Sequence, residues 1–421
     1  MKKTYNILFK ILLFVFTLQL VLTSITFAQT QRYFKTLHFE NLNKKRIHIP
    51  FELIHNLIII PLKINNSETL KFIMDTGVSY TLLTDLTGTD GIALNYLRTI
   101  KLYGHGEGDA VEAYHSVGNT IRMNQIIGRN QDILIPKDNI FHLAKTLGVQ
   151  VHGLIGYDLF KSFVVEINYR KRELVLHNPQ RYRKKRRYAS IPILIENKKP
   201  FIRASLRTSN DKEVPVKLLV DSGASHALSL FHESDSNINV PEKSFRTYIG
   251  LGLNGDIFGN IGRLQGFQLG AYTFNQPIVA YPDESSMKAS MTENQRNGSL
   301  GAELLKRFTV IFDYPARQMY LRPNADFKKP FKYNMSGIEV TTPIPGLPAY
   351  VISKVRDNSP ALEAGLLSGD QIISINGITA SKYSLNEIIE LFQSKEGRKI
   401  QLTIQRDTIK RQAKFTLRDP I

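Results

Sequence analysis

The sequence of 421 residues contains no cysteine and fewer acidic than basic residues. The absence of cysteine excludes disulfides, thiolate zinc sites, iron–sulfur clusters and a cysteine nucleophile. No metal-ligand spacing such as His-Glu-x-x-His occurs either, so we expect no metal and no cofactor. The 55 Lys and Arg against 37 Asp and Glu give a net charge of +18. Such a charge fits binding to nucleic acid or an acidic surface, but equally a solubility device or a local charge run.

A long hydrophobic run is also missing. The uninterrupted apolar stretch near the start, Ile11–Leu22, has 12 residues, whereas a helix needs about 20 to span a bilayer. Together with Lys2 and Lys3 before it and small residues after it, this stretch predicts a signal peptide over residues 1–28, cleaved after Ala28. An uncleaved anchor is the alternative. We therefore expect an exported bacterial protein, periplasmic or extracellular.

An internal repeat organises the middle of the chain. The length predicts two to four domains. Residues 70–79 and 216–225 each run from an apolar strand into Asp-[Thr/Ser]-Gly-[Val/Ala]-Ser. A glycine-rich segment follows 29 residues after each Asp, and an element ending at Gly156 or Gly301 follows after 81 or 80 residues. The period of 146 residues is far longer than a solenoid repeat, so each copy is predicted to be a lobe built from short strands.

The aspartates of the two repeats, Asp75 and Asp221, are the candidate catalytic residues. Each lies between an apolar strand and a hydroxyl-glycine pair that permits a tight turn. A pseudo-two-fold axis between the lobes would bring them together, and two carboxyls about 3 Å apart share one proton. The ionised member can activate water while the protonated member binds the scissile carbonyl. A pair of structural Asx turns is the alternative.

These motifs carry a resemblance to a known family. Asp75-Thr76-Gly77 and Asp221-Ser222-Gly223, with the apolar-glycine elements downstream, resemble the pepsin and retropepsin aspartic peptidases over roughly residues 50 to 325. The sequence is most similar to compact bacterial retropepsin-like proteins with both lobes in one chain. The resemblance implies a mainly β, bilobal double barrel, with an N-terminal lobe over residues 29–180 and a C-terminal lobe over residues 181–330.

The resemblance also implies roles for single residues. Asp75 and Asp221 would form the dyad. The hydroxyls of the residues after them would interlock beneath it and the next glycines would allow the turns; these supporting residues are Thr76, Gly77, Ser222 and Gly223. Val78 and Ala224 stand where pepsin-like enzymes place Ser or Thr. The loss of a hydroxyl donor should raise the pKa of the ionised carboxyl, so we expect activity at mildly acidic to neutral pH.

Two glycine-rich segments, residues 103–108 and 248–255, fit hairpins that close over a substrate as flaps. Ordinary surface hairpins are the alternative. The candidate flap residues are Tyr103, Gly104, Gly106, Gly250 and Gly252, with Tyr103 as the flap tyrosine of the family.

After residue 333 the pattern changes. The string from Ser359 to Gly377 closely resembles a bacterial-type PDZ domain, a small β-barrel with two helices, over residues 333–421. PDZ domains bind extended peptides and hold a terminal carboxylate in a loop of backbone N–H groups. Ser336, Gly337 and Ile338 occupy the position of that loop, which lacks the second glycine common in the family. The alternative is a PDZ domain that only packs against the catalytic body.

Two further signals have simpler explanations. Residues 181–187 carry six basic side chains among seven residues; nucleic acid is one interpretation. Export instead favours a solvated linker between the lobes, or a patch that meets an anionic envelope surface, so no nucleic acid partner is expected. Ser225 and His226 faintly resemble a nucleophile elbow, but Ala227 stands where glycine is needed.

The sequence therefore predicts an exported, monomeric aspartic endopeptidase that cleaves polypeptides and carries a C-terminal PDZ domain for a peptide or partner. A PDZ-bearing serine protease is a rival without a visible Gly-Asn-Ser-Gly motif. A catalytically inactive peptide-binding scaffold with a protease-like fold is the alternative outside enzymology.

Overall fold

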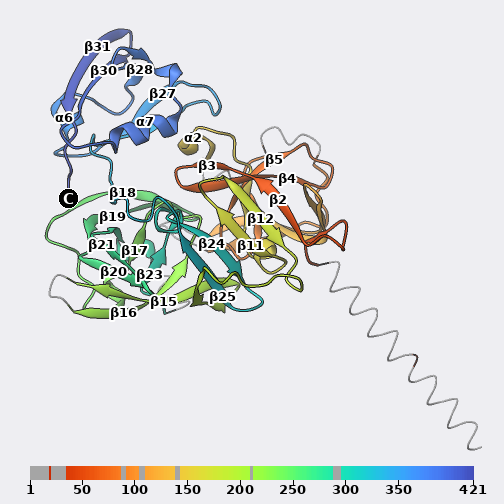
Figure 1. The fold of residues 1–421 in the computed structure, drawn as a ribbon. Helices are drawn as coiled ribbons and strands as arrows, with labels where there is room; N and C mark the ends of the chain where they lie inside the picture. The colour runs from red at the N-terminus through yellow and green to blue at the C-terminus, as the bar shows by residue number, and fades with distance from the viewer. Residues whose placement is uncertain are drawn as a thin grey trace, which may run out of the picture.

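The computed structural model describes Gln19 and residues 35–86, 92–103, 110–137, 143–208, 212–287 and 295–421. The rest of the predicted signal peptide and two of the candidate flap residues, Gly104 and Gly106, lie outside the described residues. Two β-lobes stand side by side, and a third, smaller module adjoins both (Figure 1). Among the helices of the described ranges, none has the length and apolar character needed to cross a membrane.

The N-terminal lobe is a nine-stranded sheet in the order β1-β9-β6-β10-β5-β4-β8-β7, with β3 paired to β4. Its strands are β1 (His38–Phe39), β3 (Glu52–Ile54), β4 (Leu57–Ile64), β5 (Leu70–Met74), β6 (Thr81–Leu83), β7 (Arg98–Leu102), β8 (Val111–Met123), β9 (Ile126–Pro136) and β10 (Gly153–Ile155). Its helices are α2 (Leu143–Leu147) and α3 (Tyr157–Phe160). The aliphatic run of β4 is buried on both faces in its first half and then alternates between buried and exposed, as expected where a strand leaves the core.

The C-terminal lobe repeats this plan. Its strands are β14 (Leu194–Glu196), β15 (Lys199–Arg207), β16 (Glu213–Val220), β17 (Leu228–Leu230), β18 (Ser244–Gly252), β19 (Gly255–Arg263), β20 (Gly266–Leu269), β21 (Tyr272–Asn275), β22 (Ile278–Pro282) and β23 (Gly298–Leu300), with η1 (His232–Ser234) and α5 (Ala302–Leu305). In the first lobe β10 pairs parallel with β5 and antiparallel with β6. In the second lobe β23 pairs in the same way with β16 and β17. This shared topology bears out the duplication that the repeat predicts.

A six-stranded sheet joins the lobes in the order β13-β25-β24-β11-β12-β2. Its strands are β2 (Arg46–Pro50), β11 (Val164–Asn168), β12 (Glu173–His177), β13 (Ala189–Pro192), β24 (Phe308–Asp313) and β25 (Gln318–Pro323). The equivalent strands of the two copies, β11 and β24, pair antiparallel at its centre. One hydrophobic core runs through both lobes and this sheet.

The C-terminal module has its own core, formed by residues from Met335 to Leu417. It contains β26 (Ile338–Thr341), β27 (Tyr350–Val355), β28 (Gln371–Ile375), β29 (Ile378–Thr379), β30 (Lys399–Arg406), β31 (Ile409–Thr416), α6 (Pro360–Glu363), η2 (Ala380–Lys382) and α7 (Leu385–Phe392). A capping box between Ser384 and Glu387 starts α7. The predicted fold class, mainly β with a bilobal double barrel followed by a small module, is confirmed.

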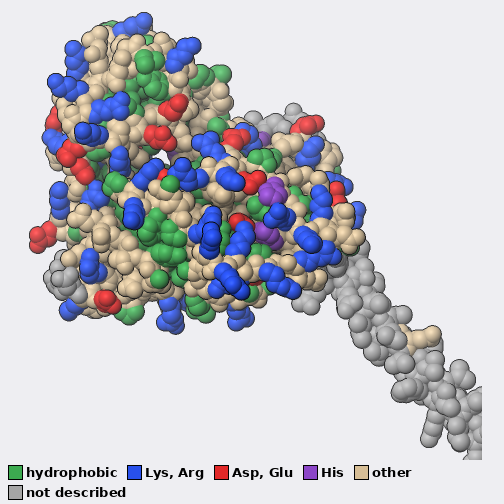
Figure 2. All heavy atoms as spheres, viewed as in Figure 1, with side chains coloured by type: hydrophobic (Ala, Val, Ile, Leu, Met, Phe, Trp, Pro, Cys, Tyr) green, Lys and Arg blue, Asp and Glu red, His purple; other side chains and the backbone are tan. Residues whose placement is uncertain are grey.

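The basic run of residues 181–187 lies against the sheet between the lobes. Lys and Arg side chains gather on that face of the molecule (Figure 2). Within the run, Lys185 Nζ donates to both carboxylate oxygens of Glu166 at 2.8 and 2.7 Å. The buried Glu166 also lies 3.0 Å from His177 Nε2. Burial alone would raise the pKa of Glu166, but the hydrogen bonds from His177 and Lys185 outweigh it and lower the pKa to about 2.

We expect Glu166→Gln to lower the free energy of unfolding by about 2 kcal/mol at pH 7, because it removes a half-screened ion pair inside the sheet. A carboxyl whose pKa is lower in the folded chain stabilises the fold above its unfolded pKa, here 4.5. That contribution disappears as the pH falls toward 2, so the difference from wild type should be much smaller at pH 3. Urea unfolding at both pH values measures it, with the exposed Glu213→Gln as control. An equal loss at both pH values would contradict the assignment to charge.

Candidate active site

The two predicted catalytic aspartates sit on matching turns. Asp75 follows β5 and Asp221 follows β16. In the first turn, the N–H of Gly77 donates to Asp75 Oδ1 at 2.6 Å. In the second, the N–H of Gly223 donates to Asp221 Oδ1 at 3.0 Å. In each turn, the backbone N–H two residues after the aspartate therefore orients the carboxyl.

The structure brings the two carboxyls together across the lobe boundary. A Cβ atom built on Gly77 would lie 3.2 Å from Asp221 Cγ, and one built on Gly223 would lie 2.2 Å from Asp75 Oδ2. Each carboxyl therefore faces the glycine of the opposite turn. At Gly223 only glycine leaves the room for this approach, whereas at Gly77 a methyl group would be a tight contact.

The electrostatics of the pair are unequal. Asp75 is buried and Asp221 is half-buried. Burial, the negative charge of Asp221 and a hydrogen bond with its carboxyl raise the pKa of Asp75 well above its ordinary value. The Gly77 N–H and the charge of Lys199 act in the opposite direction without reversing the shift. Asp75 therefore keeps a proton to a higher pH than an ordinary aspartate does.

Below the carboxyls, the hydroxyl residues of the two turns interlock. Thr76 Oγ1 donates to Val220 O at 2.6 Å, and Ser222 Oγ donates to Met74 O at 2.9 Å. The backbone N–H of Ser222 donates to Thr76 Oγ1, and that of Thr76 donates to Ser222 Oγ. Both side chains are fully buried. This closed set of bonds fixes the two turns, and hence the two carboxyls, relative to each other.

The apolar-glycine elements that end at Gly156 and Gly301 pack against the backbone of the two aspartate turns. Asp75 N donates to Ile155 O at 2.9 Å, and Asp221 N donates to Leu300 O at 2.8 Å. A Cβ on Gly156 would lie 2.1 Å from Asp75 O, which only a glycine can allow. Gly301 has the same role against the carbonyl of His226. The two downstream elements are thus equivalent in space, although their sequences match only in part.

Two further turns that the sequence analysis missed cross between the lobes. Asn56, between β3 and β4, donates through Nδ2 to Ser225 O at 3.0 Å. In the other lobe Asn197, between β14 and β15, accepts at its carbonyl oxygen from Ser79 Oγ at 2.9 Å. Both turns have two consecutive residues at positive φ. Asn in short loops between apolar strands is a signal for such turns, but it does not show what they contact.

The candidate flap residues are only partly described. Tyr103 follows β7 and is 74% exposed. In the second lobe, β18 and β19 form a hairpin whose ends pair Gly252 with Gly255. The positive φ falls on Gly255, at 115°. Gly250 instead follows a register shift in β18.

In the C-terminal module, the predicted loop residues lie together but already use their N–H groups. Ser336 N and Gly337 N donate to Asn334 Oδ1 at 3.1 and 3.3 Å. Ile338 N donates to Ser336 Oγ at 3.2 Å. A carboxylate entering this loop would have to replace the Asn334 oxygen. Peptide binding through Ser336, Gly337 and Ile338 therefore stays a prediction.

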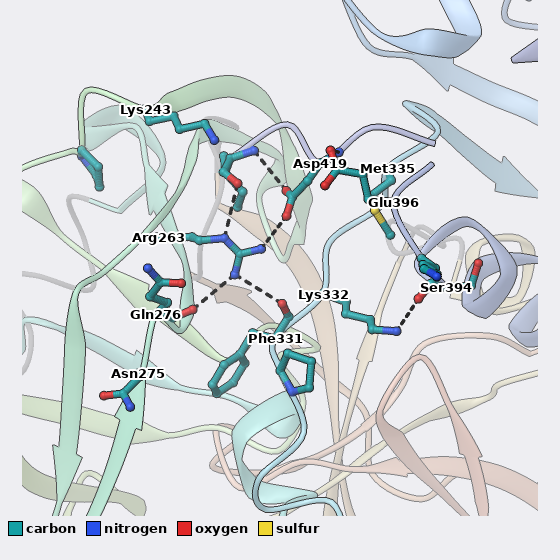
Figure 3. Close-up of a pocket in the computed structure, with 14 residues that line it drawn as sticks. Lys243, Arg263, Asn275, Gln276, Phe331, Lys332, Met335, Ser394, Glu396 and Asp419 are labelled. Atoms are coloured by element: carbon teal, nitrogen blue, oxygen red, sulfur yellow. Dashed lines mark hydrogen bonds and ion pairs between the residues drawn. The ribbon is translucent and has the colours of Figure 1, made fainter. Parts of the chain in front are cut away.

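A cavity of about 710 Å³ lies between the C-terminal lobe and the module (Figure 3). Arg263 crosses it and donates to Asp419 Oδ2 at 3.0 Å and to Phe331 O at 3.3 Å. The lining residues do not include Asp75 or Asp221, so this cavity is separate from the dyad. Within the described ranges, no group of three or more His, Asp or Glu side chains could hold a metal ion.

Comparison with known families separates the chain into two parts. Residues 60–159, from β4 to α3 and including Asp75, match the aspartyl protease family model. Residues 351–406, from β27 to β30, match the PDZ domain model. No curated protein is significantly similar to the chain. The chain therefore contains a segment similar to aspartyl proteases and, C-terminal to it, a segment similar to PDZ domains.

Proposed function

We propose that the protein is an exported aspartic endopeptidase that hydrolyses peptide bonds of polypeptide substrates as a monomer. The observation that carries the proposal is the pair Asp75 and Asp221, held face to face on duplicated turns by the interlocked hydroxyls of Thr76 and Ser222. An Asx turn alone would need neither the second carboxyl nor the interlock. The aspartyl protease match over residues 60–159 supports the same conclusion.

The unequal surroundings of the two carboxyls suggest their roles. Asp75, with the raised pKa, would hold the proton and donate a hydrogen bond to the scissile carbonyl oxygen. Asp221 would be ionised and would take a proton from a water molecule between the carboxyls as that water attacks the carbonyl carbon. The resulting tetrahedral intermediate collapses, and its C–N bond breaks, as Asp221 passes the proton that it took from water to the leaving nitrogen; no covalent intermediate with the protein forms.

The direct test is cleavage of a permanently unfolded protein by the purified full chain. We expect discrete peptide products, identified by mass spectrometry, and inhibition by pepstatin. Loss of cleavage in Asp75→Ala and Asp221→Ala would assign the products to the dyad rather than to a contaminating protease. Stoichiometric binding of the unfolded protein without any turnover by the wild type would instead favour the inactive scaffold.

The raised pKa of Asp75 predicts the pH dependence. Activity requires Asp75 protonated, so it should be lost as the pH rises through that raised pKa, giving an optimum at mildly acidic to neutral pH. Because the charge of Lys199 lowers the pKa of Asp75, Lys199→Met should move the alkaline limb of kcat/KM to higher pH. The exposed Lys212→Met is the control. A wild-type optimum below about pH 3 would contradict this prediction.

A further inference from the structure

The PDZ domain contacts the β18–β19 hairpin of the C-terminal lobe through a lysine. Lys354 Nζ of β27 lies 3.4 Å from the ring centroid of Tyr248 and 5.2 Å from that of Phe258. It also lies 3.6 Å from Asp256 Oδ2. Tyr248 and Phe258 are directly paired across the hairpin, so this single cation covers one cross-strand pair. A cation over aromatic faces is attractive even when half exposed.

A second cation from the same strand end holds the base of the hairpin. The Arg356 guanidinium lies 4.6 Å from the ring centroid of Phe245, near the start of β18. Phe245 also packs edge-to-face on Tyr333, at 5.5 Å between centroids. Arg356 is held within its own domain by two hydrogen bonds. Its backbone N–H donates to Gly337 O at 2.7 Å, and its side-chain Nη1 donates to Asn334 O at 3.2 Å.

The backbone of the hairpin is packed differently along its length. A Cβ atom built on Gly250 or Gly255 would meet no heavy atom of the described residues within 4 Å. Nearer the lobe, in contrast, a Cβ on Gly259 would lie 2.1 Å from Tyr281 O. The hairpin backbone is therefore closely packed at Gly259, whereas a side chain would find room at Gly250 and Gly255, and the loop residue Asn254 between the two strands is buried. The Lys354 contacts fall between these two regions.

The PDZ domain is at the same time attached to the N-terminal lobe, where Figure 1 shows α2 beside α7. Asn386 of α7 accepts from His55 N and donates to Leu53 O, both at 3.1 Å. Next to β26, Thr342 N donates to Lys145 O of α2 at 3.2 Å. The hairpin is thus connected through the PDZ domain to the opposite lobe.

This second attachment reaches the surroundings of the dyad. Leu147 of α2 belongs to an apolar cluster against which Val78 packs, and Val78 is the residue after the Gly77 turn. The loop after α2 also touches the PDZ domain, since a Cβ on Gly148 would lie 3.1 Å from Leu385 Cδ2. The domain therefore bridges the α2 side of one lobe and the hairpin of the other.

We propose that the PDZ domain is an internal clamp on the β18–β19 hairpin, with Lys354 and Arg356 as the residues that position it. The hairpin is the segment that the sequence predicts to cover substrate in the C-terminal lobe. The clamp holds it at a fixed place relative to the N-terminal lobe, so that it does not need to be ordered by each substrate. The consequence for catalysis rests on the proposed function, whereas the clamp itself does not.

The first experiment tests the clamp alone, because it measures backbone hydrogen exchange in the hairpin of a catalytically inactive chain. Hydrogen exchange of residues 248–258 is compared between the full-length chain and Lys354→Met, both carrying Asp75→Asn. Methionine keeps much of the lysine stem but removes its charge. We expect about fivefold faster exchange in the hairpin, restored by Lys354→Arg, because a cation–π contact of this kind is worth about that factor. Lys410→Met, on the far edge strand β31, is the matched control and should exchange like the parent.

The same substitutions are then placed in the chain with both aspartates intact. We expect Lys354→Met to raise KM severalfold for a peptide long enough to reach the hairpin, with little change in kcat. Unchanged exchange of residues 248–258 in Lys354→Met overturns the clamp, whatever the kinetics show. If Lys354→Met exchanges faster but the chain with both aspartates intact never cleaves peptides, the clamp is supported and the proposed function is overturned.

Discussion

Asp221→Asn and Asp75→Asn are each expected to reduce peptide-bond hydrolysis by roughly 10⁴-fold or more. The chemistry needs one carboxyl that accepts a proton from water and one that donates to the carbonyl oxygen. Asparagine in place of Asp221 cannot take the proton from water, and asparagine in place of Asp75 cannot give up a proton to the carbonyl oxygen. The value of kcat/KM on a fluorogenic peptide, chosen from the cleavage sites found in the unfolded protein, measures the loss. Residual activity within tenfold of wild type would contradict the dyad.

The stability of Asp75→Asn is the control that separates a catalytic from a structural role. Because burial raises the pKa of Asp75 in the folded chain, the folded state binds this proton more tightly than the unfolded state. Stability then falls as the pH rises from about 3.8 through the raised pKa. Asparagine removes that cost and can still accept from Gly77 N. We therefore expect the inactive variant to have a higher Tm than wild type at pH 7, and a smaller difference at pH 4.

The dyad could be predicted from sequence because its signal is local and occurs twice. Each aspartate follows an apolar strand and precedes a hydroxyl and a glycine, and the shared offsets place both in equivalent lobes. The interlock of Thr76 with Ser222 was implied by the resemblance, and the hydrogen bonds show its geometry. The inequality between the carboxyls was not predictable. It depends first on burial, and Lys199, which lies far from Asp75 along the chain, opposes the effect by lowering the pKa of Asp75.

Contacts between separately folded parts gave no sequence signal at all. A contact within one module was missed as well: the side chain of Asn334 accepts from the N–H groups of Ser336 and Gly337, two and three residues ahead. Lys354 is one basic residue among 55 Lys and Arg, and only the packing of two modules places it over Tyr248. Within the hairpin, the register shifts after Tyr248 and the positive φ falls on Gly255; the number and spacing of the glycines alone do not predict either feature.

Gly223→Ala is expected to be far more damaging than Gly77→Ala, although the two glycines have the same place in the two motifs. The new methyl group of Gly223→Ala would lie 2.2 Å from Asp75 Oδ2 and 2.3 Å from Asp75 Cγ. Asp75 would have to rotate its carboxyl away from Asp221 to avoid it. The methyl group of Gly77→Ala would lie 3.1 Å from Asp75 Oδ1 and 3.2 Å from Asp221 Cγ, which shifts of a few tenths of an ångström relieve.

A misplacement of about 1 Å at a reacting group can cost roughly 10²-fold in rate. We therefore expect kcat/KM to fall by about 10²–10³-fold in Gly223→Ala and by no more than about tenfold in Gly77→Ala. The two variants are matched controls for each other, because each adds one methyl group to the same turn in a different lobe. Urea unfolding of both should show that they remain folded under the assay conditions. Equal losses, or a larger loss in Gly77→Ala, would mean that the carboxyls do not face each other across these glycines in the active protein.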